Sequence, residues 1–144
     1  MTMLTQLRHR RDRRGQALVE FSLVLPIFVL LMMIVFDFGR GIYTYNGISE
    51  AAREIARTTI VNPGATLGAS AATVRTVNTQ KALVPGLRVV SYECLQFDGT
   101  PSTNDPCGSG DLVKVTVAST YSPVATLGLS GPINLVATSS LQVP

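Results

Sequence analysis

The sequence is poor in the side chains on which most metal centres and acid–base sites depend. Its 144 residues contain no tryptophan, two cysteines and a single histidine, His9. Neither a glycine-rich phosphate loop nor a Ser-His-Asp order occurs. Asp98, Asp105 and Asp111 lack the spacing of a calcium-binding loop. We therefore expect no enzymatic activity, no metal or cofactor site and no small-molecule substrate.

Charged side chains are also scarce, at 15% of the chain, and the net charge of +3 lies mainly in one segment. The first 14 residues hold five arginines and one acid, Asp12, and so carry +4. The remaining 130 residues hold seven basic and eight acidic side chains and carry −1. A nearly neutral body does not favour a nucleic-acid-binding surface, so we expect no nucleic-acid partner.

A long apolar run follows the basic head. Residues 17–36 contain one charge, Glu20, and as a helix they would span roughly 30 Å, the thickness of a bilayer hydrocarbon core. The alternative is a buried helix of a soluble core, but residues 21–36 are uncharged and offer no polar face. We predict a membrane-spanning helix over 16–38, with the arginine-rich N-terminus in the cytoplasm.

Three kinds of export signal fit a basic head followed by an apolar run. A cleaved secretory signal has a shorter run and small residues at the cut, which Phe36-Asp37-Phe38 does not provide. The Arg10-Arg11 and Arg13-Arg14 pairs are weak evidence for a twin-arginine signal. A prepilin-type signal is cut before the run, after a glycine and five residues before a glutamate. Gly15, Gln16 and Glu20 match that spacing, so we expect residues 1–15 to be a cleaved leader.

Glu20 and Pro26 are the two unusual residues in this helix. A charged carboxylate in a membrane helix costs roughly 2.5–3.5 kcal/mol, although a position near the interface lowers this cost. Glu20 is either a tolerated interfacial acid or the partner of the new α-amine on Gln16, in the same subunit or in a neighbouring one, where it would set filament register. Pro26 is either a plain kink, with Ser22 satisfying the freed backbone, or a functional hinge.

Three spaced motifs carry a family resemblance. They are RGQALVEFSLVLP at residues 14–26, FDFGR at residues 36–40 and AAREIAR at residues 51–57. The chain resembles the TadE-like family, pseudopilins of the tight-adherence (Tad, or Flp) pilus system. The resemblance implies a minor pseudopilin of the bacterial cytoplasmic membrane that acts in pilus assembly and adhesion. Its implied partners are a prepilin peptidase, other pilins and pseudopilins, and the Tad inner-membrane assembly machinery.

The helix is expected to continue as an amphipathic extension over 39–62. An apolar stripe at three- and four-residue spacing includes Ile42, Tyr45, Ile48, Ala52 and Ile55, and Asn62-Pro63-Gly64 ends it. Gly47 and Ala51 would let another element approach closely, although a break near Asn46-Gly47 is an alternative. The acid–base pairs at i,i+3 are Asp37/Arg40, Glu50/Arg53 and Glu54/Arg57. They form a solvated face or pair between subunits.

Residues 63–144 are expected to form an extracytoplasmic domain. A short helix is predicted over 69–83. Three strands follow at 87–97, with Val90, Tyr92 and Cys94 on one face, at 112–121, and at 133–143. In the second strand Val113, Val115, Val117 and Tyr121 face one way, and in the third Ile133, Leu135, Ala137, Leu141 and Val143 do. An antiparallel three-stranded sheet covered by the 42–60 helix is a pilin-like α+β fold.

The two cysteines, Cys94 and Cys107, bracket a loop on the outer side of the membrane, where disulfides persist. We predict an intramolecular disulfide, with free thiols or a metal site as weaker alternatives. Two functions therefore remain. The first is a minor pseudopilin of a Tad pilus, at the membrane or in the extracellular pilus. The second is an uncleaved single-pass membrane protein that presents a binding domain outside the cytoplasm.

Overall fold

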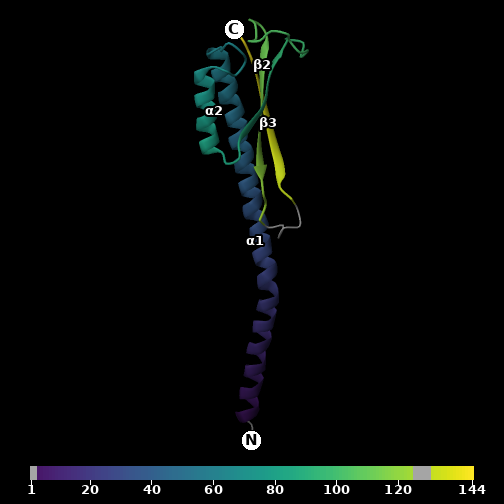
Figure 1. The fold of residues 1–144 in the computed structure, drawn as a ribbon. Coiled ribbons are helices and arrows are strands. Elements are labelled where there is room, and N and C mark those ends of the chain that lie inside the picture. Colours follow the sequence, from purple (N-terminus) through teal and green to yellow (C-terminus); the bar gives the residue numbers. More distant parts are fainter. Residues whose placement is uncertain (1–2, 125–130) are drawn as a thin grey trace. The chain divides into compact units, whose positions relative to one another are not determined.

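The computed structural model describes the backbone of residues 3–124 and 131–144, and the side chains of residues 15–124 and 131–144. Its elements are α1 (Met3–Val61), α2 (Ala71–Leu83), β1 (Arg88–Leu95), β2 (Leu112–Tyr121) and β3 (Ile133–Gln142) (Figure 1). One long N-terminal helix, one short helix and a three-stranded antiparallel sheet confirm the predicted α+β class.

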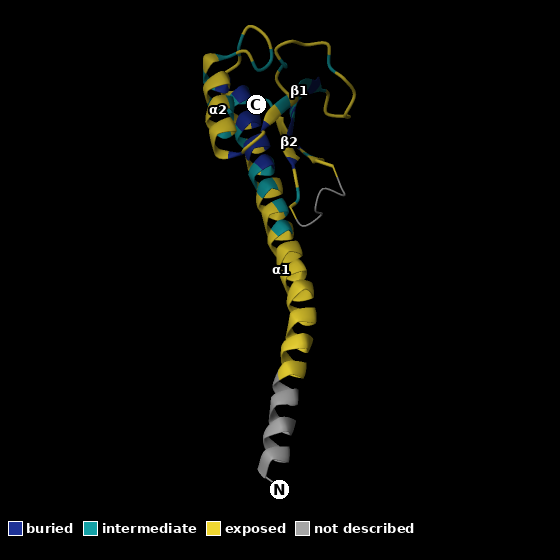
Figure 2. Cartoon of the chain, turned by 60° about the horizontal axis from the view of Figure 1, so that its bottom comes forward, coloured by how far each residue is buried: buried dark blue, intermediate teal, exposed yellow. Residues whose placement is uncertain are grey.

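The chain divides into two compact units, Met1–Phe38 and Gly39–Pro144. In the first unit α1 carries apolar side chains that are exposed along the described part of the helix (Figure 2). The helix is long and apolar enough to cross a membrane, and none of its most apolar window is buried inside the protein. A core helix of a soluble protein would be mostly buried, so this surface needs lipid or other helices to cover it.

The second unit is built around residues 39–61 of α1. Ile48, Ala51, Ala52 and Ile55 are fully buried and form one core with the inner face of the sheet, which confirms the predicted cover. Figure 1 shows this part of α1 lying between α2 and the sheet. The helix is continuous through Asn46-Gly47, so the alternative of a break there is wrong.

The small side chains of α1 explain how α2 comes close to it. A β-carbon placed on Gly47 would lie 3.1 Å from Cγ2 of Val84, the residue that caps α2. Farther along, Thr73 Oγ1 donates to Thr59 Oγ1 at 3.4 Å, and both threonines are buried. Hydroxyl contacts and a glycine thus replace large apolar side chains between the two helices.

The sheet has the order β1-β2-β3, with β2 in the centre. β2 and β3 pair over their full length, from Leu112 opposite Gln142 to Tyr121 opposite Ile133. The predicted alternation in β2 is confirmed, since Val113, Val115, Val117 and Tyr121 are buried. Ser119 is also buried on this face because its hydroxyl donates to the Pro85 carbonyl at 2.8 Å.

The predicted face of β1 is wrong at its first residue. Val90 is 57% exposed, whereas Val89 packs against the core. The register of β1 against β2 shifts between Val89 and Ser91, so β1 contains one extra residue at this point. The predicted alternation therefore holds at Tyr92 and Cys94 but not before the shift.

The predicted apolar face of β3 and the lower part of the helix stripe are only partly buried. Ala137 is buried, and Leu135 and Val143 pack against the core, but Ile133 and Leu141 remain exposed, as is usual on an edge strand. Ile42 and Tyr45 of α1 are about half exposed. They precede the buried stripe at the end of the sheet, where Tyr121 lies beside Gly41.

α2 begins two residues later than predicted because Ser70 is its N-cap. The Ser70 side chain accepts a hydrogen bond from the Thr73 amide at 3.1 Å. Pro85-Gly86 then turns the chain toward β1, and Gly86 adopts a positive φ of 73° that favours glycine.

Candidate functional site

The first candidate site is the predicted processing segment, which lies within the first unit. Gly15 and Gln16 are exposed on α1, and none of the residues whose side chains are described would obstruct a side chain at Gly15. The Gln16 side-chain amide donates to the Glu20 carboxylate, with 3.1 Å between Nε2 and Oε1. Glu20 therefore lies one helical turn from Gln16 and on the same face. A positive charge at position 16 would meet this carboxylate.

Pro26 lies inside α1, and the helix continues on both sides of it. A proline frees the carbonyl four residues earlier, which is that of Ser22. The Ser22 hydroxyl donates to the Val19 carbonyl at 2.8 Å, three residues before it. The prediction that Ser22 satisfies the backbone freed by Pro26 is therefore wrong.

The three predicted charge pairs of α1 do not all form in the same way. Glu50 and Arg53 form an ion pair at 4.0 Å, with both side chains 73% exposed, so its contribution to stability is small. Within the described part of α1, Glu54 and Arg57 form no such pair; Glu54 is half-buried and Arg57 is exposed. Asp37 and Arg40 each take part in a polar or ring interaction, and whether they pair with each other stays a prediction.

Arg40 has a contact that the sequence did not predict. Its guanidinium lies over the ring of Tyr121, 5.5 Å from the ring centre. Cation–π contacts of this kind contribute about 0.5–1 kcal/mol at exposed sites. Arg40 thus ties the beginning of the second unit to the end of β2.

The disulfide is confirmed. Cys94 and Cys107 are bonded, with 5.5 Å between their α-carbons, and the described part of the chain contains no free cysteine. The bond closes a loop at the end of the sheet where β1 ends and β2 begins.

Asp98 and Asp111 accept hydrogen bonds from groups of the loop region, whereas Asp105 accepts one from the Leu67 amide at 2.6 Å. The Asp111 carboxylate accepts hydrogen bonds from the side chains of Asn104 and Ser102 and from the Gly108 amide, all at 3.0 Å. These bonds, chiefly that of Asn104, lower the pKa of Asp111. Asp98 accepts from the hydroxyl and the amide of Thr100, which lowers its pKa in the same way. The carboxylates are thus engaged as acceptors. Among the side chains of residues 15–124 and 131–144, no three metal-ligating groups come together.

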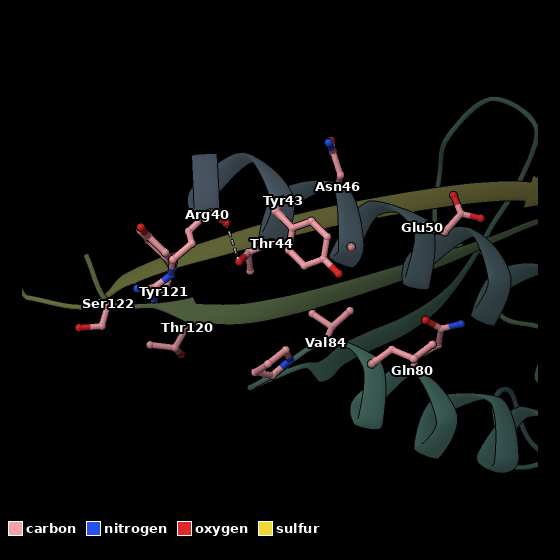
Figure 3. Close-up of a pocket in the computed structure, with 13 residues that line it drawn as sticks. Arg40, Tyr43, Thr44, Asn46, Glu50, Gln80, Val84, Thr120, Tyr121 and Ser122 are labelled. Carbon is pink, nitrogen blue, oxygen red and sulfur yellow. Dashed lines mark hydrogen bonds between the residues drawn. The ribbon is translucent and has the colours of Figure 1, made fainter. Parts of the chain in front are cut away.

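A groove of about 580 Å³ lies in the second unit between α1, the end of α2 and the end of β2. Figure 3 shows Tyr43 and Val84 facing each other across it, with Arg40 and Tyr121 at one end. Glu50 and Gln80 lie at the other end. The groove can accept an apolar side chain flanked by polar groups. Sequence reasoning missed it because its walls come from three segments far apart in the chain. The only signals were Gly47 and the tyrosine at 43.

Comparison with known protein families gives a match to the N-terminal part of the chain. Residues 15–57 match the family described as TadE-like protein. The match over these residues confirms the resemblance seen in the sequence. No curated protein matches the chain. No solved structure matches it either.

The TadE-like match covers only some of the candidate sites. It begins at Gly15 and includes Gln16, Glu20 and Pro26, together with the charge pairs of α1. It ends at residue 57, before α2, the sheet, the disulfide loop and about half of the groove lining. The function of the outer unit therefore has to be argued from its own residues.

Proposed function

We propose that the chain is a minor pseudopilin of a Tad (Flp) pilus that acts in pilus assembly and adhesion. A prepilin peptidase cuts it between Gly15 and Gln16, and the mature chain begins at Gln16. The observation that carries the proposal is the coincidence of two features. The TadE-like match starts at Gly15, and the Glu20 carboxylate lies within hydrogen-bonding distance of the Gln16 side chain.

Cleavage would create a positive charge that the Glu20 carboxylate can neutralise. Hydrolysis of the bond between the Gly15 carbonyl and the Gln16 nitrogen leaves a carboxylate on the leader and an ammonium group on Gln16. An ammonium at a helix N-terminus is unfavourable, because the helix dipole is positive there. A carboxylate from Glu20 of a neighbouring subunit would neutralise it and fix the axial register between the two chains.

The exposed helix surface suits both stages of this role. Before assembly, lipid covers the apolar side chains of residues 17–36, and the N-terminal arginines hold that end in the cytoplasm. After assembly, neighbouring helices would take the place of lipid. Other pilins, pseudopilins and the Tad inner-membrane machinery are the partners that this exchange requires.

The second candidate is an uncleaved single-pass protein whose helix only tethers the outer unit. The groove beside Tyr43 and Val84 favours this alternative, because a binding domain needs a concave apolar surface. The two functions differ in the role of Glu20. The pseudopilin needs it for pilus assembly, whereas the tethered protein does not.

Substitutions at Glu20 test the proposal. In the native host, we expect Glu20→Gln and Glu20→Ala to insert normally and to abolish piliation, because neither side chain can neutralise an ammonium group. Glu20→Asp keeps the charge on a shorter side chain and is the matched control, with partial piliation expected. Unchanged piliation in Glu20→Ala would remove the register argument and favour the tethered binding domain.

A further inference from the structure

β3 is an edge strand whose free side carries none of the features that usually protect such an edge. It pairs with β2 on one side (Figure 1), and among the described residues it forms no backbone–backbone hydrogen bond with any other segment. The strand is ten residues long and uncharged, contains no proline, and keeps one register against β2 without a bulge. Natural proteins usually interrupt an edge of this kind, because its unpaired amides and carbonyls attract another strand.

The other edge of the sheet is protected. β1 carries two charged residues, Arg88 and Glu93, and a bulge interrupts its register against β2. Near the end of β1 the chain folds back along it, and the Ser102 amide donates to the Cys94 carbonyl at 2.8 Å. The two edges therefore differ, and β3 is the one that is open to a partner.

The backbone groups on the free side of β3 follow from one residue at its end. The Val143 amide donates to the Asp111 carbonyl at 2.8 Å, and the Val143 carbonyl accepts from the Gly110 amide at 3.0 Å, so both groups point toward β2. In an antiparallel strand these groups alternate between the two sides from one residue to the next. The even-numbered residues therefore present their backbone groups to the free edge, and their side chains are exposed on the outer face of the sheet: Asn134, Val136, Thr138, Ser140 and Gln142.

A second copy of β3 fits this edge in one antiparallel register. A two-fold axis at Thr138 pairs Val136 with Ser140 and Asn134 with Gln142, so every free amide and carbonyl takes part, in about ten hydrogen bonds. An axis at Val136 or Ser140 would leave residues unpaired at the ends of both strands. An odd-numbered residue cannot lie on the axis, because its backbone groups already bond to β2.

The side chains also match in this register. On the outer face the paired side chains are uncharged, and Thr138 lies opposite Thr138 of the second copy, which is a favourable cross-strand pair. On the inner face, Leu135 lies beside Leu141 of the second copy, and Ile133 lies beside its Val143. In the single chain Leu141 is 37% exposed and Ile133 is 48% exposed, so the pairing covers apolar surface that the fold leaves open.

The charged side chains of the sheet do not oppose the pairing. Lys114 and Glu93 form an ion pair at 2.8 Å. Arg88 lies beside one end of β3, where it donates to the Asn134 side chain at 3.4 Å, and Asp111 lies beside the other end, just before β2. The two-fold axis brings these two ends together, so unlike charges meet at each end of the pair.

We propose that two copies of the outer unit pair through β3 in this register and form one continuous antiparallel sheet. α1 enters the unit beside the end of β3 that pairs with Tyr121, since Gly41 lies near the Tyr121 ring. Antiparallel pairing places the two points of entry at opposite ends of the joined sheet. The partner is therefore a copy presented by a separate, facing surface, and the contact is a homotypic adhesive one. This inference rests on the proposed function only for display outside the cytoplasm, and it does not depend on leader cleavage or pilus assembly.

Charge substitutions on the two-fold axis test the pairing. The full-length chain is placed in lipid nanodiscs that hold one copy, in two colours, and fluorescence cross-correlation measures how many discs diffuse together. Thr138→Lys and Thr138→Asp each place like charges opposite each other and should abolish pairing. A mixture of Thr138→Lys discs with Thr138→Asp discs should restore it, because unlike charges then face each other. Thr116→Lys is the matched control and should pair like the unsubstituted chain, because Thr116 lies opposite Thr138 on the central strand and not at the edge.

Single cysteines test the register. Under mild oxidation Thr138→Cys should link two discs, because the α-carbons of a hydrogen-bonded antiparallel pair lie about 5.5 Å apart, within the range of a disulfide. Val136→Cys alone should not, because its counterpart lies about four residues away along the strand, roughly 13 Å. A mixture of Val136→Cys discs with Ser140→Cys discs should link again. Mass spectrometry identifies the linked residues and checks that the bond between Cys94 and Cys107 is intact.

Two results would overturn the inference. One is the absence of pairing between discs of the unsubstituted chain, which is also the result expected if β3 binds a strand of a different protein. The other is pairing that does not follow the register, with Val136→Cys linking as readily as Thr138→Cys, or with the mixed charge variants failing to restore association. Unchanged circular dichroism shows that each variant is folded. Neither result affects leader cleavage, which the Glu20 variants test separately.

Discussion

Gly47 is where the side chain of Val84 meets the backbone of α1. A β-carbon at this position would lie 3.1 Å from Cγ2 of Val84, closer than ordinary van der Waals contact. The substitution Gly47→Ala therefore has two opposing effects. It raises helix propensity by about 1 kcal/mol, and it inserts a methyl group into a packed contact, which typically costs 1–3 kcal/mol.

Gly41→Ala is the matched control for the propensity effect. It lies on the same helix, and its β-carbon would meet only the Tyr121 ring, at 3.8 Å, an ordinary contact. We expect Gly41→Ala to be neutral or stabilising. We expect Gly47→Ala to be less stable than Gly41→Ala by about 1–3 kcal/mol, which is the packing cost, because the propensity gain is shared and cancels.

The assay is urea unfolding of the full chain in nanodiscs, followed by far-ultraviolet circular dichroism. A double-mutant cycle with Val84→Ala isolates the contact, because the smaller side chain makes room for the new methyl group. The cost of Gly47→Ala should largely disappear in that background. If Gly47→Ala is as stable as Gly41→Ala, or if Val84→Ala does not rescue it, the close approach of Val84 does not explain the glycine.

Three further predictions concern the outer unit. Replacing both Cys94 and Cys107 by serine should lower the free energy of unfolding by about 3 kcal/mol in the chain-entropy model, and an unchanged urea midpoint would contradict this. Asp111 has a lowered pKa in the folded protein, so its contribution is present above its usual pKa of 3.8 and is lost as the pH falls through the lowered value. The loss of stability between pH 6 and pH 3 should therefore be smaller in Asp111→Asn, and an equal loss would count against the loop hydrogen bonds. Ser70→Ala removes the N-cap of α2 and should cost about 1 kcal/mol, whereas Ser70→Asp should retain most of the stability.

The sequence predicts the fold well where one rule acts alone. The alternation of β2 predicts its buried valines and both of its limits, and the pattern of β3 predicts its limits to within one residue. The uncharged run of residues 21–36 predicts a helix that the protein does not bury. Two cysteines on the predicted outer side allow one pairing, and it is the pairing observed.

The sequence does not predict features that depend on contacts between distant segments of the chain. The face of Val90 depends on a register shift against β2 that alternation within β1 cannot show. Ser119 is buried only because the Pro85 carbonyl accepts its hydrogen bond. The groove combines α1 with the end of β2, and no local pattern in either segment marks the contact.

The N-terminus of the protein from its native host tests the central claim most directly. Mass spectrometry of membranes and of sheared pili would identify the first residue of the mature chain. The proposed function predicts Gln16 as that residue, with Gly15→Leu blocking the cut. An intact N-terminus in cells that make pili would contradict the account, because Glu20 would then have no ammonium group to neutralise.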